Sequence, residues 1–84
     1  MAVETLPAII KRVRGERSTR DVVAVMREHD ASLTLDHSAL VRWESGATTP
    51  KLPALRAYLR ATGASIRDSL AAETAWMDVK GGGR

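Results

Sequence analysis

The sequence contains no cysteine and no phenylalanine, and its aromatic residues are one tyrosine and two tryptophans. Without cysteine, the chain has neither disulfides nor a thiolate metal site to stabilise a small fold. Its two histidines, His29 and His37, leave a metal ion without enough ligands. We therefore expect no metal and no cofactor, and a core of valine, leucine, isoleucine and alanine, a composition that suits packed helices.

Long apolar runs are also missing. No stretch approaches the roughly 20 residues of a membrane span, and Glu4 and Pro7 interrupt the N-terminal region, where a signal peptide would be continuously apolar. We expect a cytoplasmic protein without membrane association. A chain of 84 residues is long enough for one domain with a modest core, but too short to add a deep catalytic cleft.

The net charge of +3 is modest, but the basic residues are unevenly distributed. Residues 11–20 contain five basic side chains and one acidic side chain, Glu16, whereas the charges of residues 61–84 are balanced. A polyanion would therefore meet the first half of the chain. Taken alone, such a basic run is more often a solvated helix face than a nucleic-acid contact, so the signal depends on the motif beside it.

Apolar residues recur at three- and four-residue spacing in five segments, which predicts an all-α domain of five helices. Caps, prolines and glycines give the approximate bounds 6–14, 19–29, 37–45, 50–62 and 65–79. Ser18 or Thr19 is the expected cap of the second helix, and Asp36 that of the third. We expect one domain over residues 1–79 and a flexible tail over residues 80–84, because consecutive glycines cost backbone entropy.

The aromatic residues carry separate expectations. Trp43 should lie in the core, where the third helix meets the first and the fourth. Tyr58 should lie at the edge of the core with its hydroxyl in water. Trp76 and Met77 form a large apolar pair near the tail, and the sequence leaves two roles open for them: a lid over the small core, or a dimer contact.

Two helices joined by a connector, the second capped by Asp36 and ending in Trp43-Glu44-Ser45-Gly46, are followed by a Thr/Pro connector and another helix. In this arrangement the chain resembles the helix-turn-helix family of the lambdoid phage Cro and cI repressors and the xenobiotic-response-element regulators. The resemblance is strongest over residues 40–63, where Leu-Val-Arg-Trp-Glu-Ser-Gly and Thr-Thr-Pro-Lys-Leu-Pro-Ala-Leu look like the family's recognition-helix end and fourth helix. It implies a compact five-helix bundle with a lambda-repressor-like helix-turn-helix in the second and third helices.

One departure from the family pattern lies between these two helices, where the chain has about six or seven extra residues around Arg27 to Thr34. Either the second helix is longer by a turn or more, or a true loop separates the two helices. By the same resemblance, an arginine of the first helix pairs with the glutamate of the Glu-x-Gly turn. The expected structural pair is Arg12 with Glu44.

The resemblance implies that the third helix enters the major groove of duplex DNA, where residues near its N-terminus reach base edges. Arg42 has the planar guanidinium that holds guanine O6 and N7, and Val41 suits a thymine methyl. The expected base contacts are His37, Ser38, Val41 and Arg42. The expected phosphate contacts lie at two helix starts and the residues beside them: Arg17, Thr19, Arg20, Thr48, Thr49 and Lys51.

These expectations describe a transcriptional regulator, and in particular a repressor that binds a pseudo-palindromic operator as a homodimer. One recognition helix reads too few base pairs to mark a genomic site, so such domains usually pair about a two-fold axis. The candidate dimer residues on the fifth helix are Ile66, Leu70, Trp76 and Met77. We do not expect an enzyme, because Glu44 and His37 lack a nucleophile and a pocket.

Two alternatives stay open at this point. In the first, the chain is an antitoxin-like or adaptor protein whose C-terminal helix binds a protein partner, while the helix-turn-helix provides autoregulation. In the second, the extra residues between the motif helices disable insertion into the groove and leave a protein-interaction module. Co-purification with a partner would favour the first, and an intact fold without DNA binding would favour the second.

Overall fold

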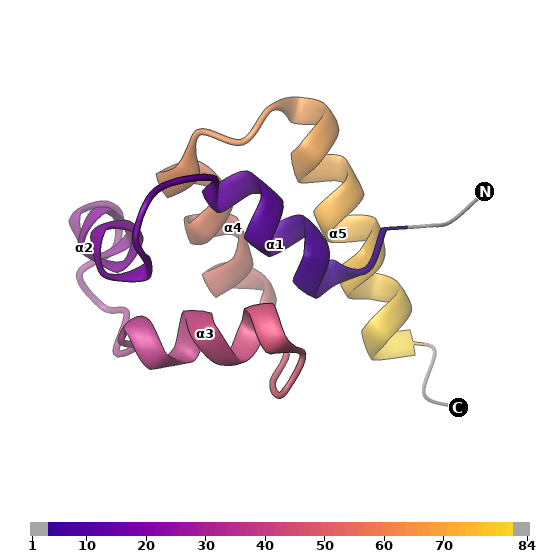
Figure 1. Ribbon diagram of the computed structural model, residues 1–84, viewed down its shortest axis with the longest axis horizontal. Helices are drawn as coiled ribbons and strands as arrows, with labels where there is room; N and C mark the ends of the chain where they lie inside the picture. The colour runs from indigo at the N-terminus through magenta and orange to yellow at the C-terminus, as the bar shows by residue number, and fades with distance from the viewer. Residues whose placement is uncertain (1–3, 82–84) are drawn as a thin grey trace.

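Five α-helices account for most of residues 4–81, the part of the chain that this computed structural model describes (Figure 1). In chain order they are α1 (Leu6–Arg14), α2 (Thr19–His29), α3 (His37–Ser45), α4 (Leu52–Thr62) and α5 (Ile66–Gly81). Residues 4–81 contain no strand, so the predicted all-α fold of five helices is confirmed.

Side-chain caps and a glycine define the helices that matter most for the site. The Ser18 hydroxyl accepts a hydrogen bond from the backbone N–H of Asp21 at 3.0 Å, so Ser18 and not Thr19 caps α2. The Asp36 carboxylate caps α3 as predicted. That helix ends at Ser45, and Gly46 caps it with a φ of 82°, which is unfavourable for any residue with a Cβ atom.

The bounds of two helices differ from the predicted ones. Helix α4 begins at Leu52, after Pro50, with Pro53 in its first turn. Helix α5 continues through Lys80 to Gly81, past the predicted end at residue 79. The Lys80 ammonium lies 5.8 Å from the centre of the Trp76 ring, one turn earlier, and this contact supports the last turn. The rest of the predicted tail, residues 82–84, lies outside the described residues.

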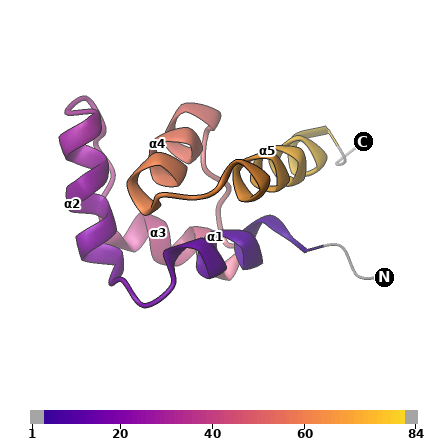
Figure 2. The same cartoon turned by 90° about the horizontal axis from the view of Figure 1, so that it is seen from above.

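Helix α1 lies at the centre of the fold, against α3, α4 and α5. Helix α2 packs on α3 and α4 and forms one end of the molecule, whereas α5 forms the other end (Figures 1 and 2). In Figure 1, α2 is seen almost end-on while α3 lies across the page, so these two helices cross steeply instead of running side by side.

All five helices contribute to one core. Its buried residues are Leu6, Ile9, Ile10, Val22, Val23, Met26, Leu40, Trp43, Leu55, Ala57, Tyr58, Leu59, Ala61 and Ala72. The expected core position of Trp43 is confirmed, and its ring meets Tyr58 edge to face at 6.0 Å between centroids. The expectation for Tyr58 is wrong. Its side chain is fully buried, and its hydroxyl donates to the Ile10 carbonyl at 2.6 Å, because a phenol without access to water needs a protein acceptor.

Helix α5 is apolar on two opposite faces. Small residues, Ala71, Ala72 and Ala75, pack toward the core, and this face allows α1 to approach closely. The opposite face carries Ile66, Leu70 and Met77, which are 81%, 63% and 65% exposed. These three lie within about 40° of one another around the helix, and we call them the α5 apolar stripe.

Trp76 does not belong to this stripe. It is half-buried against the core, and its indole Nε1–H donates to the Pro50 carbonyl at 2.7 Å. The structure therefore separates the two residues that the sequence placed together: Trp76 covers the core, and Met77 faces outward.

Candidate nucleic-acid interface

Helix α3 has one face fixed in the core and one face open. Leu40 and Trp43 are buried, and they hold the helix against α1 and α2. The open face carries Val41, Arg42 and Ser45, all exposed, together with the half-buried Ser38. These four residues fall within about 100° around the helix axis. Three of the four predicted base contacts thus share one surface, and Ser45 joins them although it was not predicted.

The start of α3 is fixed by local hydrogen bonds. Asp36 accepts from the backbone N–H of Ala39 at 3.2 Å, so its carboxylate is occupied as the N-cap. His37, the remaining predicted base contact, is half-buried at the edge of the open face. It lines a hollow of about 220 Å³ between α2 and α3, together with Arg20 and Arg27. His37 therefore lies beside the open face and not at its centre.

The partner of Glu44 is Arg14 and not Arg12, which corrects the predicted structural pair. Two guanidinium nitrogens of Arg14, Nε and Nη2, donate to the two carboxylate oxygens of Glu44, the second at 2.9 Å. The Arg14 and Glu44 side chains are 20% and 12% exposed. Arg14 also donates to the Arg17 carbonyl at 2.6 Å, so the pair ties α1 and the turn after it to the end of α3.

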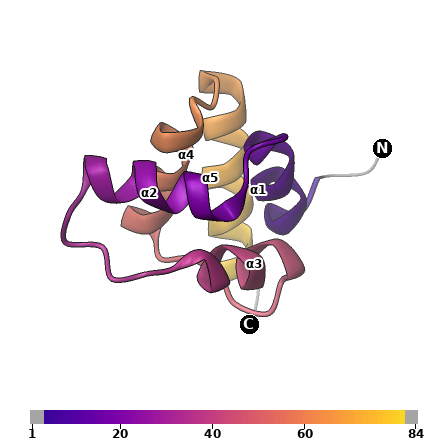
Figure 3. The ribbon, with the colours of Figure 1, turned by 60° about the vertical axis from the view of Figure 1, so that its left-hand side comes forward.

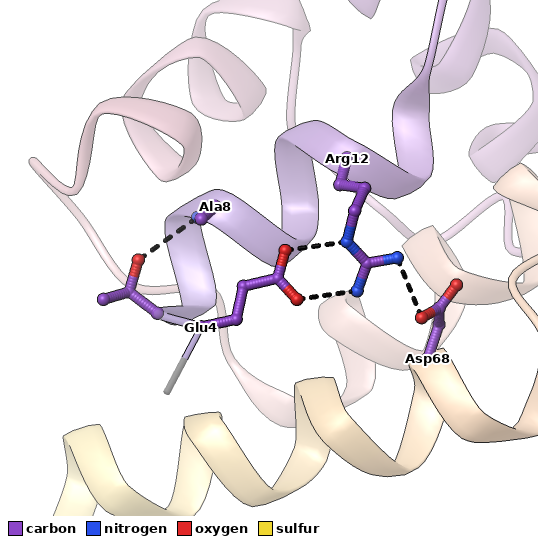
Figure 4. Close-up of polar contacts among 5 residues, drawn as sticks. Glu4, Ala8, Arg12 and Asp68 are labelled. Atoms are coloured by element: carbon purple, nitrogen blue, oxygen red, sulfur yellow. Dashed lines mark hydrogen bonds and ion pairs between the residues drawn. The ribbon is translucent and has the colours of Figure 1, made fainter. Parts of the chain in front are cut away.

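Arg12 is directed to the other side of α1, where it reaches α5 (Figure 4). Its guanidinium donates to both carboxylate oxygens of Glu4 at 2.7 and 2.8 Å and to Asp68 at 2.9 Å. Residues 12 and 14 lie about 200° apart around a helix, so their side chains project from opposite sides of α1. Arg14 lies one turn after the buried Ile10 and therefore on the same side of α1 as that residue. The hydrogen bonds from Arg12 lower the pKa of the Glu4 carboxyl below its usual value.

Arg17 and Thr19 lie at the turn from α1 to α2. The Arg17 guanidinium donates to the Ala61 carbonyl near the end of α4 at 2.9 Å, and this bond restricts the side chain. Thr19 is half-buried as the first residue of α2, and Arg20 beside it is exposed. The backbone N–H groups of this first turn point out of the helix end, where an anion is favoured.

The second predicted phosphate group lies in the connector from α3 to α4. Thr48 and Lys51 are exposed, and Thr49 is half-buried. The backbone N–H groups of Ala47 and Thr48 donate to the Arg42 carbonyl at 3.0 and 3.4 Å, which folds the connector back on α3. Pro50 is buried, and its carbonyl accepts from Trp76, so the connector is held from both sides.

Between α2 and α3 the chain forms a true loop, residues 30–36, which decides between the two possibilities left open by the sequence (Figure 3). Helix α2 ends at His29 as predicted. Leu33 and Leu35 are partly buried against the core and anchor the loop there. The Asp30 carboxylate accepts from the Ser32 backbone N–H at 3.0 Å and from its hydroxyl, and these bonds lower the pKa of Asp30.

Arg27 links this loop to α2, since its Nη2 donates to the Leu35 carbonyl at 2.6 Å. Arg27 is not among the predicted DNA contacts. The signal that identifies it is its spacing from Arg20: seven residues, or two turns, place both side chains on one face of α2.

No family model, no curated protein and no solved structure matches the chain. The structure itself adds two further findings for residues 4–81. They contain no cluster of three or more histidine, aspartate or glutamate side chains that would hold a metal ion. None of the helices in this part of the chain is both long enough and apolar enough to cross a membrane.

Proposed function

We propose that this domain binds double-stranded DNA and inserts α3 into the major groove. The observation that carries the proposal is the division of α3 into a buried face and an open face. Leu40 and Trp43 fix the helix, while Ser38, Val41 and Arg42 project from its other side. A major groove about 12 Å wide admits one helix, and base edges are recognised by side chains of this kind.

Each side chain of the open face has a distinct part in recognition. Arg42 offers a bidentate pair of N–H donors to guanine O6 and N7. Val41, which is 51% exposed, offers an apolar surface to a thymine methyl group. Ser38 provides a hydroxyl that donates or accepts, and His37 contributes a ring nitrogen at the edge of the same face. The Ser45 hydroxyl donates to the Arg42 carbonyl at 3.0 Å, so it offers DNA an acceptor. Arg42 and Ser38 carry most of the sequence preference in this account.

Phosphate contacts lie on both sides of α3. Thr19 and Arg20 contribute the start of α2, and Arg17, although bonded to Ala61, retains further N–H donors for an anion. Thr48, Thr49 and Lys51 contribute the connector before α4. Contacts of this kind fix the position of the domain on the duplex without discriminating among sequences.

The resemblance to the Cro and cI repressor family supports the same function. The steep crossing of α2 and α3 in Figure 1 is the arrangement that a helix-turn-helix requires. The connector of residues 30–36 is longer than the three or four residues usual for that motif. Because Leu33 and Leu35 anchor the loop on the core and leave the open face of α3 exposed, the loop is compatible with insertion into the groove.

We further propose that the protein acts as a homodimer that represses transcription at a pseudo-palindromic operator. Two copies present two recognition helices to half-sites about 34 Å apart. The candidate contact is the α5 apolar stripe, Ile66, Leu70 and Met77, whose exposure favours a partner. Trp76 contributes indirectly, by fixing α5 to the Pro50 carbonyl.

The same stripe supports one alternative function. In an antitoxin-like or adaptor protein, Ile66, Leu70 and Met77 would bind a different protein, and DNA binding by α3 would serve autoregulation. Both functions use α3 in the same way and differ only in the molecule that covers α5. The oligomeric state of the purified protein distinguishes them.

The test of DNA binding is an in vitro selection from random duplex DNA, followed by titration of the enriched sequence at two salt concentrations. We expect an enriched site with two-fold symmetry and an affinity that falls steeply as salt rises. An outcome without enrichment, in which every duplex binds equally weakly, would contradict sequence-specific binding and favour a protein-interaction module that does not insert α3 into the groove.

A further inference from the structure

Two arginines line the hollow between α2 and α3, and only Arg20 of the two is among the phosphate contacts described above. Its volume is about 220 Å³, and its lining residues are Arg20, Val23, Ala24, Arg27, Asp36 and His37. We propose that this hollow seats one backbone phosphate of the duplex between Arg20 and Arg27, which makes Arg27 a phosphate-binding residue. The inference rests on the proposed DNA-binding function and adds a contact from outside the predicted set.

Two arginines converge on the hollow from one face of α2. Arg20 and Arg27 are seven residues apart, and this spacing separates them by about 20° around the helix and about 10 Å along it. Val23 and Ala24 lie between them and form an apolar floor. Guanidinium groups at the two ends of such a floor match the several oxygens of a phosphate better than a single cation does.

The loop of residues 30–36 holds Arg27 in position. The Leu35 carbonyl accepts one N–H of the Arg27 guanidinium at 2.6 Å. A guanidinium has five N–H donors, so this bond restricts the side chain and leaves capacity for an anion. A restricted side chain loses less rotamer freedom on binding. The extra residues of this chain thereby contribute a contact that a short turn would not supply.

Acidic groups near the hollow do not cancel its positive charge. Asp36 is the one carboxylate in the lining, and it is engaged as the cap of α3. Asp21 and Glu28 on α2 lie about 100° around the helix from Arg20 and Arg27, on the neighbouring face. The lining thus contains two arginines against one carboxylate, which favours an anion.

The hollow also adjoins the open face of α3. His37 lines the hollow, and Val41, one turn later on the same side of α3, belongs to the open face. A phosphate in the hollow would therefore flank the bases that α3 contacts. Its effect would be on the affinity for every duplex and on the position of α3 in the groove, not on the choice of base.

The test compares the salt dependence of duplex binding for Arg27→Gln and the parent protein. One lost phosphate contact lowers the slope of log K against log salt by about 0.9. We expect this loss for selected and unselected duplexes alike. Arg67→Gln is the matched control, because it removes the same charge from an exposed site on α5 that neither lines the hollow nor belongs to the proposed DNA contacts, and its slope should equal that of the parent.

One further variant and a check of folding complete the comparison. Arg27→Lys keeps the charge and should keep the slope, and thermal unfolding should show that all three variants are folded. A parent slope in Arg27→Gln, or a loss in Arg27→Lys as large as in Arg27→Gln, would overturn the phosphate site while leaving DNA binding intact. If the parent itself binds no duplex, the proposed function fails.

A titration with inorganic phosphate distinguishes a backbone phosphate of DNA from a free phosphate ion as the anion that the hollow binds. A phosphate titration followed by backbone amide NMR shifts should give little change around the hollow in the millimolar range, because a DNA phosphate is held by the rest of the interface as well. Saturable shifts that Arg27→Gln abolishes, with an unchanged duplex slope, would assign the hollow to a free anion and overturn the proposal.

Discussion

Arg14 on α1 donates two hydrogen bonds to the carboxylate of Glu44 on α3, and both side chains are largely withdrawn from water. Through this pair, the central helix of the fold fixes the end of the helix that we propose enters the groove. The bond from Arg14 to the Arg17 carbonyl extends the same connection to the turn before α2.

Loss of this pair should destabilise the domain. In Arg14→Gln, Glu44 loses its bidentate partner in a site that water reaches poorly, and we expect the free energy of unfolding to fall by about 1–3 kcal/mol. Arg12→Gln is the control, because Arg12 makes its ion pairs at the surface, where such pairs contribute little. Urea unfolding followed by tryptophan fluorescence measures both. An equal or larger loss in Arg12→Gln would contradict this assignment.

Tyr58 provides a test of the core. Burial, and to a lesser degree the charge of Glu44, raise the pKa of its hydroxyl above the usual value of 10.0. A group whose pKa is raised in the folded state contributes stability below its unfolded pKa and loses this contribution as pH rises through its folded pKa. We expect the domain to lose stability above about pH 10, with phenolate absorbance appearing only as the chain unfolds.

Because the chain has a single tyrosine, this absorbance has one source. Tyr58→Phe should remove the alkaline transition and, through the lost bond to Ile10, about 1 kcal/mol of stability at neutral pH. A phenol that titrates near pH 10 in the folded protein would show that Tyr58 is accessible to water.

The α5 apolar stripe should control self-association without supporting the fold. The double variant Ile66→Gln, Leu70→Gln changes two exposed side chains, so its stability should stay within about 0.5 kcal/mol of the parent. We expect sedimentation velocity to show a dimeric parent and a monomeric double variant. Val79→Gln serves as the control, since Val79 is 48% exposed on a different face of α5, and it should remain dimeric. A monomeric parent would favour a foreign partner for the stripe.

The helices could be predicted from the sequence because their ends are determined locally. Ser18, Asp36 and Gly46 act within one turn of chain, and each does in the structure what its type predicts. The partners across the fold were harder to predict. Arg12 and Arg14 are both basic residues of one helix, and only the rotation of α1 against α3 and α5 decides which of them meets Glu44.

Helix α5 shows the same limit for packing. Ile66, Leu70 and Met77 form one stripe and its alanines form another on the opposite face, and periodicity alone does not state which stripe faces inward. The structure buries the alanine stripe, because small side chains let α5 lie close to α1. The position of Arg27 was also beyond prediction, because its side chain is fixed by a bond to the Leu35 carbonyl, and the residue types did not predict the path of that loop.

The most direct test of the central claim is the binding of Arg42→Ala to the selected duplex and to versions of it with each base pair changed in turn. If α3 contacts base edges, Arg42→Ala should lose about 1–3 kcal/mol of binding free energy and become indifferent to one base position. Lys51→Ala, a phosphate variant, should weaken all duplexes alike. Binding by Arg42→Ala that is as tight and as selective as that of the parent would contradict the placement of α3 in the groove.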